Sequence, residues 1–266
     1  MNELDNAASD LVNFESNITV NDATIKSRFN GMGWTKSIEN MNVLVIGAGG
    51  IGSWLAFNLA RIGVNSITIF DDDKAECVNM SGQLIPIYGI GKFKCDILAD
   101  EIVRYCGSIN IKSIHERFTQ GESVNYDAVF CAVDNMETRR MVANMIYRLE
   151  ENGTPLVFID GRLSVDELQV YNVICSDRKQ IETYLNNKNC MFDDHEAFET
   201  ICNMKQTSYM ANMIGIVMTN ILVNVASSLK EDSACEIPFF VKYSSQDMEF
   251  VKMGYDEWLL TNGREE

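Results

Sequence analysis

The chain of 266 residues is 46% hydrophobic and 23% charged, an ordinary globular composition with enough length for one large α/β domain or a core domain with appendages. Its 38 acidic and 22 basic residues give a formal net charge of −16 at pH 7. This balance argues against a nucleic-acid partner, which needs a basic surface, and against a polybasic contact with a membrane.

Residues 1–40 are polar and weakly patterned, and we expect them to form an N-terminal helical arm. From residue 42 onward, short apolar runs alternate with segments of helical spacing, as in strands buried on both faces and their crossover helices. The expected strands are 42–46, 66–70, 109–114, 128–133 and 156–159, and the expected helices are 53–62, 94–105 and 136–149. Such βαβ repetition predicts a parallel, twisted sheet covered on both faces.

The pattern changes after residue 161. Residues 167–174 alternate as in a half-buried strand, and the charged stretch 176–199 predicts a mobile, loop-rich segment. Next come an expected long apolar helix and a terminal hairpin, at 209–229 and at 239–243 with 249–253. The predicted fold class is therefore α/β, with a Rossmann-like, doubly wound, mostly parallel sheet and a C-terminal antiparallel extension.

The apolar helix at 209–229 is long enough to cross a bilayer, which takes about 20 residues without charge. Amide and hydroxyl side chains interrupt it at Asn212, Thr219, Asn220 and Asn224, and each would be costly in hydrocarbon. We therefore predict a buried core helix and not a membrane span. The acidic, polar N-terminus is unlike a signal peptide, and the predicted location is cytoplasmic.

The eight cysteines form no CxxC pair, and the two histidines, His115 and His195, lie far apart in the sequence. Structural zinc sites use closely spaced cysteines and histidines, and disulfide frameworks belong to short secreted chains. We therefore expect reduced, mostly buried thiols and no zinc.

A glycine-rich turn directly follows the first predicted strand. Gly47, Gly49 and Gly52 form the motif GxGxxG, with Gly50 between them, where the chain enters a helix. In such turns the first glycine permits the tight bend, the second lets a phosphate approach the backbone, and the third lets helix and strand pack closely. The helix N-terminus adds unpaired N–H groups and partial positive charge. The turn predicts a nucleotide site.

Asp71 stands 24 residues after Gly47, at the end of the second predicted strand. A carboxylate at this place suits a ribose hydroxyl. NAD and ATP both carry that ribose, so these two features leave a dehydrogenase and an ATP-using enzyme open. A solvated, acidic strand end explains one aspartate easily and the run of three at 71–73 less well.

Motifs further along the chain separate these two classes. Residues 43–79, VLVIGAGGIGSWLAFNLARIGVNSITIFDDDKAECVN, join GxGGxGS to a strand ending in D-x-D and to Asn79, eight residues after Asp71. The basic residue Lys94 follows a short turn, and Asp134-Asn135-x-x-x-Arg139 comes later. Over 42–162, with a weaker match near 202–220, the chain resembles the ThiF/MoeB/HesA family of ubiquitin-activating-enzyme-like adenylyltransferases. Unrelated Rossmann proteins have no reason to carry this lysine and DNxxxR together.

The resemblance implies ATP and Mg²⁺ as ligands. The implied nucleotide-binding residues are Gly47, Gly49, Gly50, Gly52, Asp71, Asp73, Asn79, Lys94 and Asn135. Asp71 would hold the ribose, Asn79 and Lys94 would approach the phosphates, and Asp134 would bind Mg²⁺ near the α-phosphate. Arg139 either acts there or only braces the Asp134 loop.

Two departures from the family pattern bear on catalysis. Where the family has N-L-x-R-Q after its D-x-D, this chain has Asn79-Met-Ser-Gly82-Gln83, so Gly82 replaces an arginine. Near the N-terminus, Arg28-Phe-Asn-Gly31 only partly matches the family's R-Y-x-R. Either Arg162 supplies the missing charge, or catalysis is slow, or the subunit binds nucleotide without using it.

Cys202 comes shortly before Lys205 and the expected start of the long helix. In family members that pass the acyl group to sulfur, the cysteine lies at such a place, and a thiol beside a lysine at a helix N-terminus has a lowered pKa. The alternative is a small hydrophobic residue packed against the helix. Cys190 is the second candidate, because carboxylates follow it closely and would raise its pKa.

We therefore expect a ThiF-type adenylation domain over 41–266, with a crossover segment at about 176–204. It would convert a carboxylate into its acyl-AMP with release of pyrophosphate, and the acyl group could then pass to a cysteine. Its catalytic residues would be Lys94, Asp134, Arg162 and Cys202. The carboxylate would belong to a ubiquitin-like or sulfur-carrier protein, a peptide or a small molecule, and the resemblance implies a homodimer. The alternatives are a catalytically silent, nucleotide-binding partner subunit and an NAD-dependent oxidoreductase.

Overall fold

The computed structural model describes residues 29, 31–107, 109–149, 153–192, 207–229 and 235–263. The chain divides into two compact units, residues 1–32 and residues 33–266, and the fold below is that of the second. Most of the expected N-terminal arm lies outside the described residues. Its last part contains the short helix α3 (Thr35–Ile38), and the boundary at residue 40 stays a prediction.

In the described part of the chain, eight strands form one sheet in the order β3-β2-β1-β4-β5-β6-β7-β8. The five strands from β3 to β5 are parallel, and β6, β7 and β8 continue the sheet antiparallel. The strands are β1 (Asn42–Ile46), β2 (Ser66–Phe70), β3 (Asn110–Ile114), β4 (Ala128–Cys131), β5 (Val157–Leu163), β6 (Glu167–Ile174), β7 (Phe240–Ser244) and β8 (Glu249–Met253). The predicted fold class is confirmed, including the antiparallel extension and the terminal hairpin.

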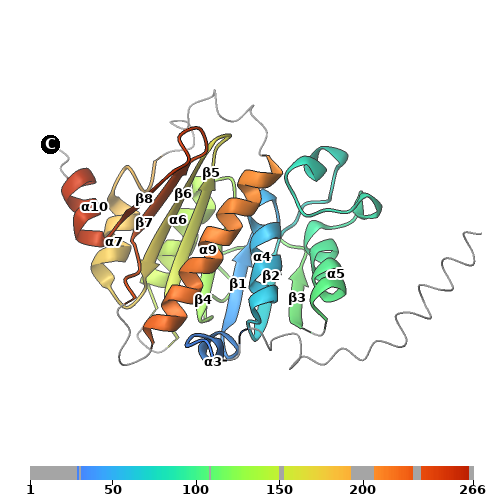
Figure 1. Ribbon diagram of the computed structural model, residues 1–266, viewed down its shortest axis with the longest axis horizontal. Helices are drawn as coiled ribbons and strands as arrows, with labels where there is room; N and C mark the ends of the chain where they lie inside the picture. The colour runs from blue at the N-terminus through green and yellow to red at the C-terminus, as the bar shows by residue number, and fades with distance from the viewer. Residues whose placement is uncertain are drawn as a thin grey trace, which may run out of the picture. The chain divides into compact units, whose positions relative to one another are not determined.

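Helices cover both faces of this sheet (Figure 1). The first face carries α4 (Gly50–Ile62), α5 (Lys94–Cys106) and α9 (Ser208–Ser228), and the second carries α6 (Met136–Tyr147), α7 (Arg178–Asn186) and α10 (Tyr255–Asn262). Successive residues of β1 point to opposite faces of the sheet. Val43 and Val45 pack with the first set of helices, and Leu44 and Ile46 pack with the second. This is why the strand is apolar at successive positions.

The long apolar helix α9 lies against the sheet and α4. By length and composition it could cross a membrane, but Ile214, Met218 and Leu222 are buried in the core. Gly215 permits a close approach to α4, since a Cβ atom there would lie 2.9 Å from the backbone nitrogen of Leu55. The prediction of a buried core helix is confirmed.

Two helices were not expected. The stretch 176–199 was predicted to be loop-rich, yet α7 occupies residues 178–186. The Asp177 side chain caps this helix by accepting a hydrogen bond from the backbone N–H of Lys179 at 3.0 Å, and Tyr184 is fully buried. Helix α10 follows the hairpin because Trp258 is buried against Phe239, with 5.1 Å between ring centroids. In both cases tertiary burial of one aromatic residue outweighs weak local signals.

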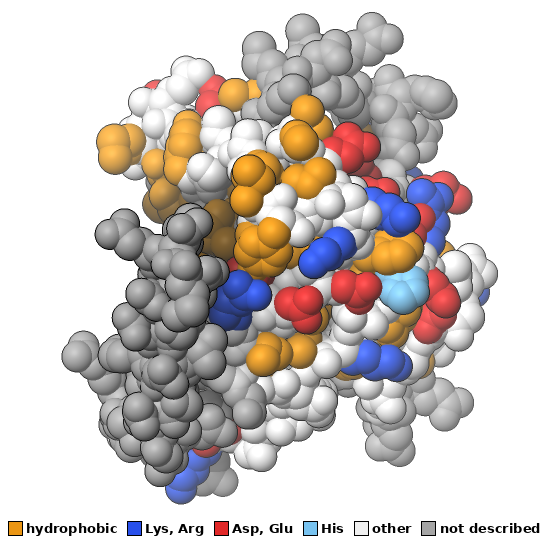
Figure 2. All heavy atoms as spheres, turned by 90° about the vertical axis from the view of Figure 1, so that its right-hand side faces the viewer, with side chains coloured by type: hydrophobic (Ala, Val, Ile, Leu, Met, Phe, Trp, Pro, Cys, Tyr) orange, Lys and Arg blue, Asp and Glu red, His pale blue; other side chains and the backbone are white. Residues whose placement is uncertain are grey.

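The β3 edge of the sheet is bordered by α5 and by the loops before it. Figure 2 shows this side of the molecule, where acidic and basic side chains lie between apolar ones. Val103 and Tyr105 on α5 are exposed, and His115 stacks on Phe93 with 4.5 Å between ring centroids. This side therefore carries no charge field of a single sign.

Candidate active site

The glycine turn, residues 47–52, joins β1 to the first turn of α4. Gly47 has φ +97°, and a Cβ atom there would lie 2.7 Å from the carbonyl oxygen of Ala132. A Cβ atom on Gly52 would collide with the carbonyl oxygen of Gly47. By contrast, a Cβ atom on Gly49 would meet only Gln83 Nε2, at 4.0 Å. Gly47 and Gly52 are thus needed for the turn itself, and Gly49 leaves room for a ligand to approach the backbone.

The side chain of Asp71, at the end of β2, is hydrogen-bonded to this turn. One carboxylate oxygen accepts a hydrogen bond from the Ala48 N–H at 2.6 Å, and the other accepts from the Asp73 N–H at 2.9 Å. Burial raises the pKa of Asp71, although the two backbone hydrogen bonds and the charge of Lys94 oppose that shift. Each oxygen keeps a second lone pair. The carboxyl group is therefore positioned beside the turn and can still accept a ribose hydroxyl, which remains the predicted role.

Lys94 starts α5 and points to the same edge of the sheet. Its side chain is 9% exposed, and Nζ donates to Asp73 Oδ2 at 2.7 Å, whereas the side chain of Asp73 is 67% exposed. The backbone N–H of Lys94 also donates to the carbonyl of Asp73 at 2.9 Å. The structure thus brings Asp71, Asp73 and Lys94 together, with the cation held by the protein and its counter-charge in contact with water.

The segment after β2 folds back against α4. Trp54 Nε1 donates to the carbonyl of Gly82 at 2.9 Å, and the N–H of Leu84 donates to Ser53 Oγ at 3.0 Å. Asn79 lies within this segment, in the 3-10 helix η2 (Cys77–Ser81), where its Oδ1 accepts from the N–H of Glu76 at 2.8 Å. These hydrogen bonds hold the Asn79 segment against the first turns of α4, and contact of Asn79 with the phosphates stays a prediction.

Gln83 is a site residue to which the sequence analysis assigned no role. Its Nε2 is the atom nearest to the open position at Gly49, and its Oε1 is buried without a hydrogen-bond partner among the described residues. A second short 3-10 turn, η3 (Ile87–Gly89), follows it. The signal for Gln83 was the N-L-x-R-Q pattern, in which this chain keeps the glutamine and loses the arginine at Gly82.

Asp134 and Asn135 follow β4 on the other side of the turn. The side chain of Asn135 caps α6, since its Oδ1 accepts a hydrogen bond from the N–H of Thr138 at 2.9 Å. Asp134 is exposed. No three acidic, histidine or cysteine side chains converge on a metal site within the described residues. Magnesium commonly uses one or two carboxylates with substrate phosphates, so a single exposed carboxylate fits a metal that arrives with a nucleotide.

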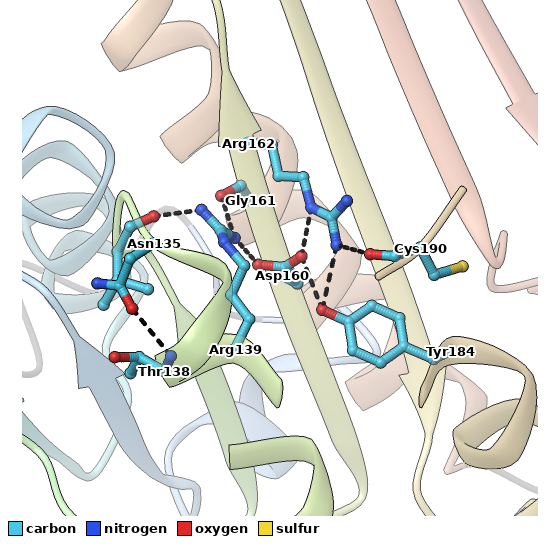
Figure 3. A network of polar contacts seen from close by, with 9 residues as sticks. Asn135, Thr138, Arg139, Asp160, Gly161, Arg162, Tyr184 and Cys190 are labelled. Atoms are coloured by element: carbon cyan, nitrogen blue, oxygen red, sulfur yellow. Dashed lines mark hydrogen bonds and ion pairs between the residues drawn. The ribbon is translucent and has the colours of Figure 1, made fainter. Parts of the chain in front are cut away.

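Arg139 lies in a group that we call the Asp160 cluster, formed by the buried residues Asp160, Arg139 and Tyr184 and by Arg162, whose side chain is 11% exposed (Figure 3). Arg139 donates to Asp160 Oδ1, to the carbonyl of Gly161 at 3.0 Å and to the carbonyl of Val133. These contacts match the bracing interpretation of Arg139, because Val133 directly precedes Asp134.

Arg162 occupies the other side of the same carboxylate. Its Nε donates to Asp160 Oδ2 at 2.7 Å, and its Nη2 donates to the carbonyl of Cys190 at 2.5 Å and lies 3.4 Å from the hydroxyl of Tyr184. Its Nη1 has no hydrogen-bond partner among the described residues. The prediction that Arg162 supplies charge to the phosphates stays a prediction, since the contacts seen here hold the chain itself.

The two candidate thiols have different standing. Cys202 and Lys205 lie outside the described residues, so the thioester prediction is unchanged. Cys190 is fully buried, and burial raises the pKa of its thiol to about 12. A thiol that stays protonated is a poor nucleophile. The sequence analysis ranked Cys190 second because of its acidic neighbours, and the structure gives burial as a stronger reason.

Comparison with known proteins gives a family and a set of relatives. The ThiF family matches residues 21–257 of this chain. The adenylyltransferase and sulfurtransferase MOCS3 of Culex quinquefasciatus is 28% identical over 185 residues, which are 68% of this chain and 40% of that protein. The tRNA threonylcarbamoyladenosine dehydratase of Haemophilus influenzae is 28% identical over 148 residues, 51% of this chain and 56% of that protein. The chain thus spans about half the length of these relatives.

Solved structures show the same fold at low identity. A crystal structure of PaaA has a TM-score of 0.67 at 13% identity, covering 89% of this chain and 74% of that one. Escherichia coli MccB with ATP has a TM-score of 0.62 at 15% identity, covering 84% and 66%. Escherichia coli TcdA in complex with AMP has a TM-score of 0.58 at 18% identity, covering 77% and 93%.

Proposed function

The chain belongs to the ThiF family, and we propose that it is an ATP-dependent adenylyltransferase. It would activate a carboxylate as its acyl-adenylate and release pyrophosphate. The relatives that it matches include proteins named as adenylyltransferases, MOCS3 and MoeZ. The structural neighbour MccB has been solved with ATP.

One observation carries the proposal: Asp71 links the glycine turn, with its open approach at Gly49, to the cation of Lys94. A side chain at Gly49 would meet only Gln83 within 4 Å. Lys94 is buried at the same edge, and its charge acts on Asp71. Backbone N–H groups at the start of α4 and this ammonium group together suit an oligophosphate. A nicotinamide dinucleotide would also use the turn and Asp71, but it gives no reason for the Lys94–Asp73 pair.

The residues then divide the work of phosphoryl chemistry. The glycine turn would hold phosphate oxygens through its N–H groups, Lys94 would neutralise charge, and Asp71 would orient the ribose. Mg²⁺ held by Asp134 and the phosphates would add positive charge as phosphorus is attacked. The carboxylate substrate is already ionised at neutral pH, so this step needs no general base.

The carboxylate would come from a ubiquitin-like or sulfur-carrier protein, a peptide or a small molecule. Relatives named as a SUMO-activating enzyme subunit and as an adenylyltransferase/sulfurtransferase support the protein class, and a complex of MccB with MccA supports a partner bound to this fold. A homodimer, on the resemblance to the family, and a cytoplasmic location, on the expected reduced thiols, complete the proposal.

The test is ATP–pyrophosphate exchange with Mg²⁺, measured across small proteins ending in Gly-Gly and short peptides. Exchange that depends on one of these substrates supports the proposal. Nucleotide binding without exchange for any substrate, including glycine-terminated peptides and small carboxylic acids, would favour the silent partner subunit. That alternative has one specific support, the loss of the family arginine at Gly82.

Transfer to sulfur is tested separately with Cys202→Ser. Exchange should survive this substitution because adenylation precedes the thiol step. A covalent adduct with the acyl partner that is cleaved by thiol reductants should disappear. If the adduct persists in Cys202→Ser and is lost in Cys190→Ser, the nucleophile has been assigned to the wrong cysteine.

A further inference from the structure

Two arginines share one buried carboxylate in the Asp160 cluster (Figure 3). Asp160 is fully buried, and the side chains of Arg139 and Arg162 are 6% and 11% exposed. Arg139 approaches Oδ1 and Arg162 approaches Oδ2, while the hydroxyl of Tyr184 donates to Oδ2 at 2.8 Å. The carboxylate therefore fixes the orientation of both guanidinium groups at once.

Besides its contact with Asp160, each arginine donates a hydrogen bond to a backbone carbonyl of a different loop. Arg139 donates to the carbonyl of Val133, where the chain leaves β4 toward Asp134. Arg162 donates to the carbonyl of Cys190, in the turn after α7 that is closed by the N–H groups of Cys190 and Met191 on the carbonyl of Asn187 at 3.0 and 2.8 Å. The first loop borders the candidate nucleotide site, and the second lies within the expected crossover segment at about 176–204.

The two loops are therefore linked through one residue. The guanidinium groups carry like charge: burial lowers the pKa of Arg139, and the positive charge of Arg162 lowers it further. Only Asp160 pairs with either arginine among the described residues. If the Val133 carbonyl shifted, Arg139 would follow it and the Asp160 carboxylate would rotate. The hydrogen bond from Arg162 to the carbonyl of Cys190 would then change. Buried hydrogen-bond networks of this kind couple their members beyond pairwise sums.

We propose that Asp160 is a positioning residue that couples the Asp134 loop to the turn at residues 187–192. Binding of nucleotide at the Asp134 loop strengthens the contact of Arg162 with that turn, so this part of the expected crossover segment responds to the nucleotide state. The inference rests on the proposed function for the identity of the nucleotide, ATP with Mg²⁺.

The readout is the rate at which N-ethylmaleimide labels Cys190, divided by the rate for Cys175 in the same protein. Both thiols are buried and have their pKa raised to about 12 by burial, but Cys175 makes its hydrogen bond to the carbonyl of Val173, outside the cluster. Global unfolding exposes both, so the ratio isolates local opening of the turn. Mass spectrometry of peptides from the full-length chain gives both rates.

In the wild type, ATP with Mg²⁺ should lower this ratio at least about fivefold, the lower end of typical coupling between sites. Asp160→Asn should raise the ratio without nucleotide and remove its response to ATP. Asp127→Asn is the matched control: this carboxylate accepts from the N–H of Asn42 at 2.7 Å, outside the cluster, and the substitution should leave the response intact. If Asp160→Asn does not fold, Arg162→Gln replaces it with the same expectation, because it removes the ion pair with Asp160 together with the hydrogen bond to the carbonyl of Cys190.

Thermal stabilisation by ATP separates the two possible failures. If ATP stabilises the wild type but leaves its labelling ratio unchanged, the coupling is wrong and the adenylyltransferase proposal stays intact. An equal response in wild type and Asp160→Asn overturns the coupling as well. Absence of stabilisation by ATP contradicts the proposed function, and the coupling falls with it.

Discussion

The glycine-turn edge and the Asp160 cluster both hold charged side chains, but they differ in what faces water. Lys94 is buried while its partner Asp73 is 67% exposed. In the Asp160 cluster the carboxylate is fully buried, and the side chains of Arg139 and Arg162 are only 6% and 11% exposed. An exposed counter-charge can give way to a phosphate at small cost, because water already solvates it. A fully buried group cannot be exchanged in this way. The first region is arranged to receive a ligand, and the second to hold the chain.

The largest expected effect comes from breaking the second region. Asp160→Ala leaves two buried guanidinium groups without a counter-charge, and the free energy of unfolding should fall by about 3–5 kcal/mol. Asp73→Ala, the matched change in the first region, should cost no more than about 1 kcal/mol, because the exposed Asp73 is already solvated and the charge of Asp71 still acts on Lys94. Urea unfolding of both variants measures the difference. Equal costs would show that the two regions do not differ as described.

Asp134→Ala tests the ligand-receiving region through its chemistry. Removing this carboxylate should lower Mg²⁺-dependent exchange by about 10²–10³, a typical cost of one lost electrostatic contact in the transition state. Because Asp134 is exposed, the unfolding free energy should change by less than about 0.5 kcal/mol. Exchange close to the wild-type rate would show that the metal role assigned by resemblance is wrong.

The buried thiols near the second region give a smaller, pH-dependent effect. Burial raises the pKa of Cys190 from 9.0 to about 12, so between these values the unfolded chain loses a proton that the folded chain keeps. The contribution of this thiol to the free energy of unfolding is therefore fully present below pH 9 and is lost as the pH rises toward 12. Between these two pH values, this one thiol should lower the free energy of unfolding by about 1.4 kcal/mol per pH unit. Urea unfolding at pH 9 and 11 should show a shallower loss in Cys190→Ala, and an identical slope would contradict the burial argument.

The sequence predicted these two regions unequally, for a physical reason. The glycine turn and Asp71 follow from local motifs, since a tight bend and a helix N-terminus need particular residues at fixed spacing, and Lys94 follows from the resemblance to the family. The Asp160 cluster joins residues from β5, α6 and α7, and only the folded sheet brings them together. The same limit explains why α7 and α10 were missed: each depends on burial of one aromatic side chain by distant elements.

The central claim, that the open approach at Gly49 is an ATP site, is tested most directly by ligand-induced stabilisation. ATP with Mg²⁺ should stabilise the wild type by about 2.7 kcal/mol at roughly a hundred times Kd, and NAD should stabilise it less. Gly49→Val should fold, because a Cβ atom there meets only Gln83 Nε2 at 4.0 Å, yet it should lose the effect of ATP, since the side chain fills the space that a phosphate needs. Equal or greater stabilisation by NAD, or an undiminished ATP effect in Gly49→Val, would contradict the account.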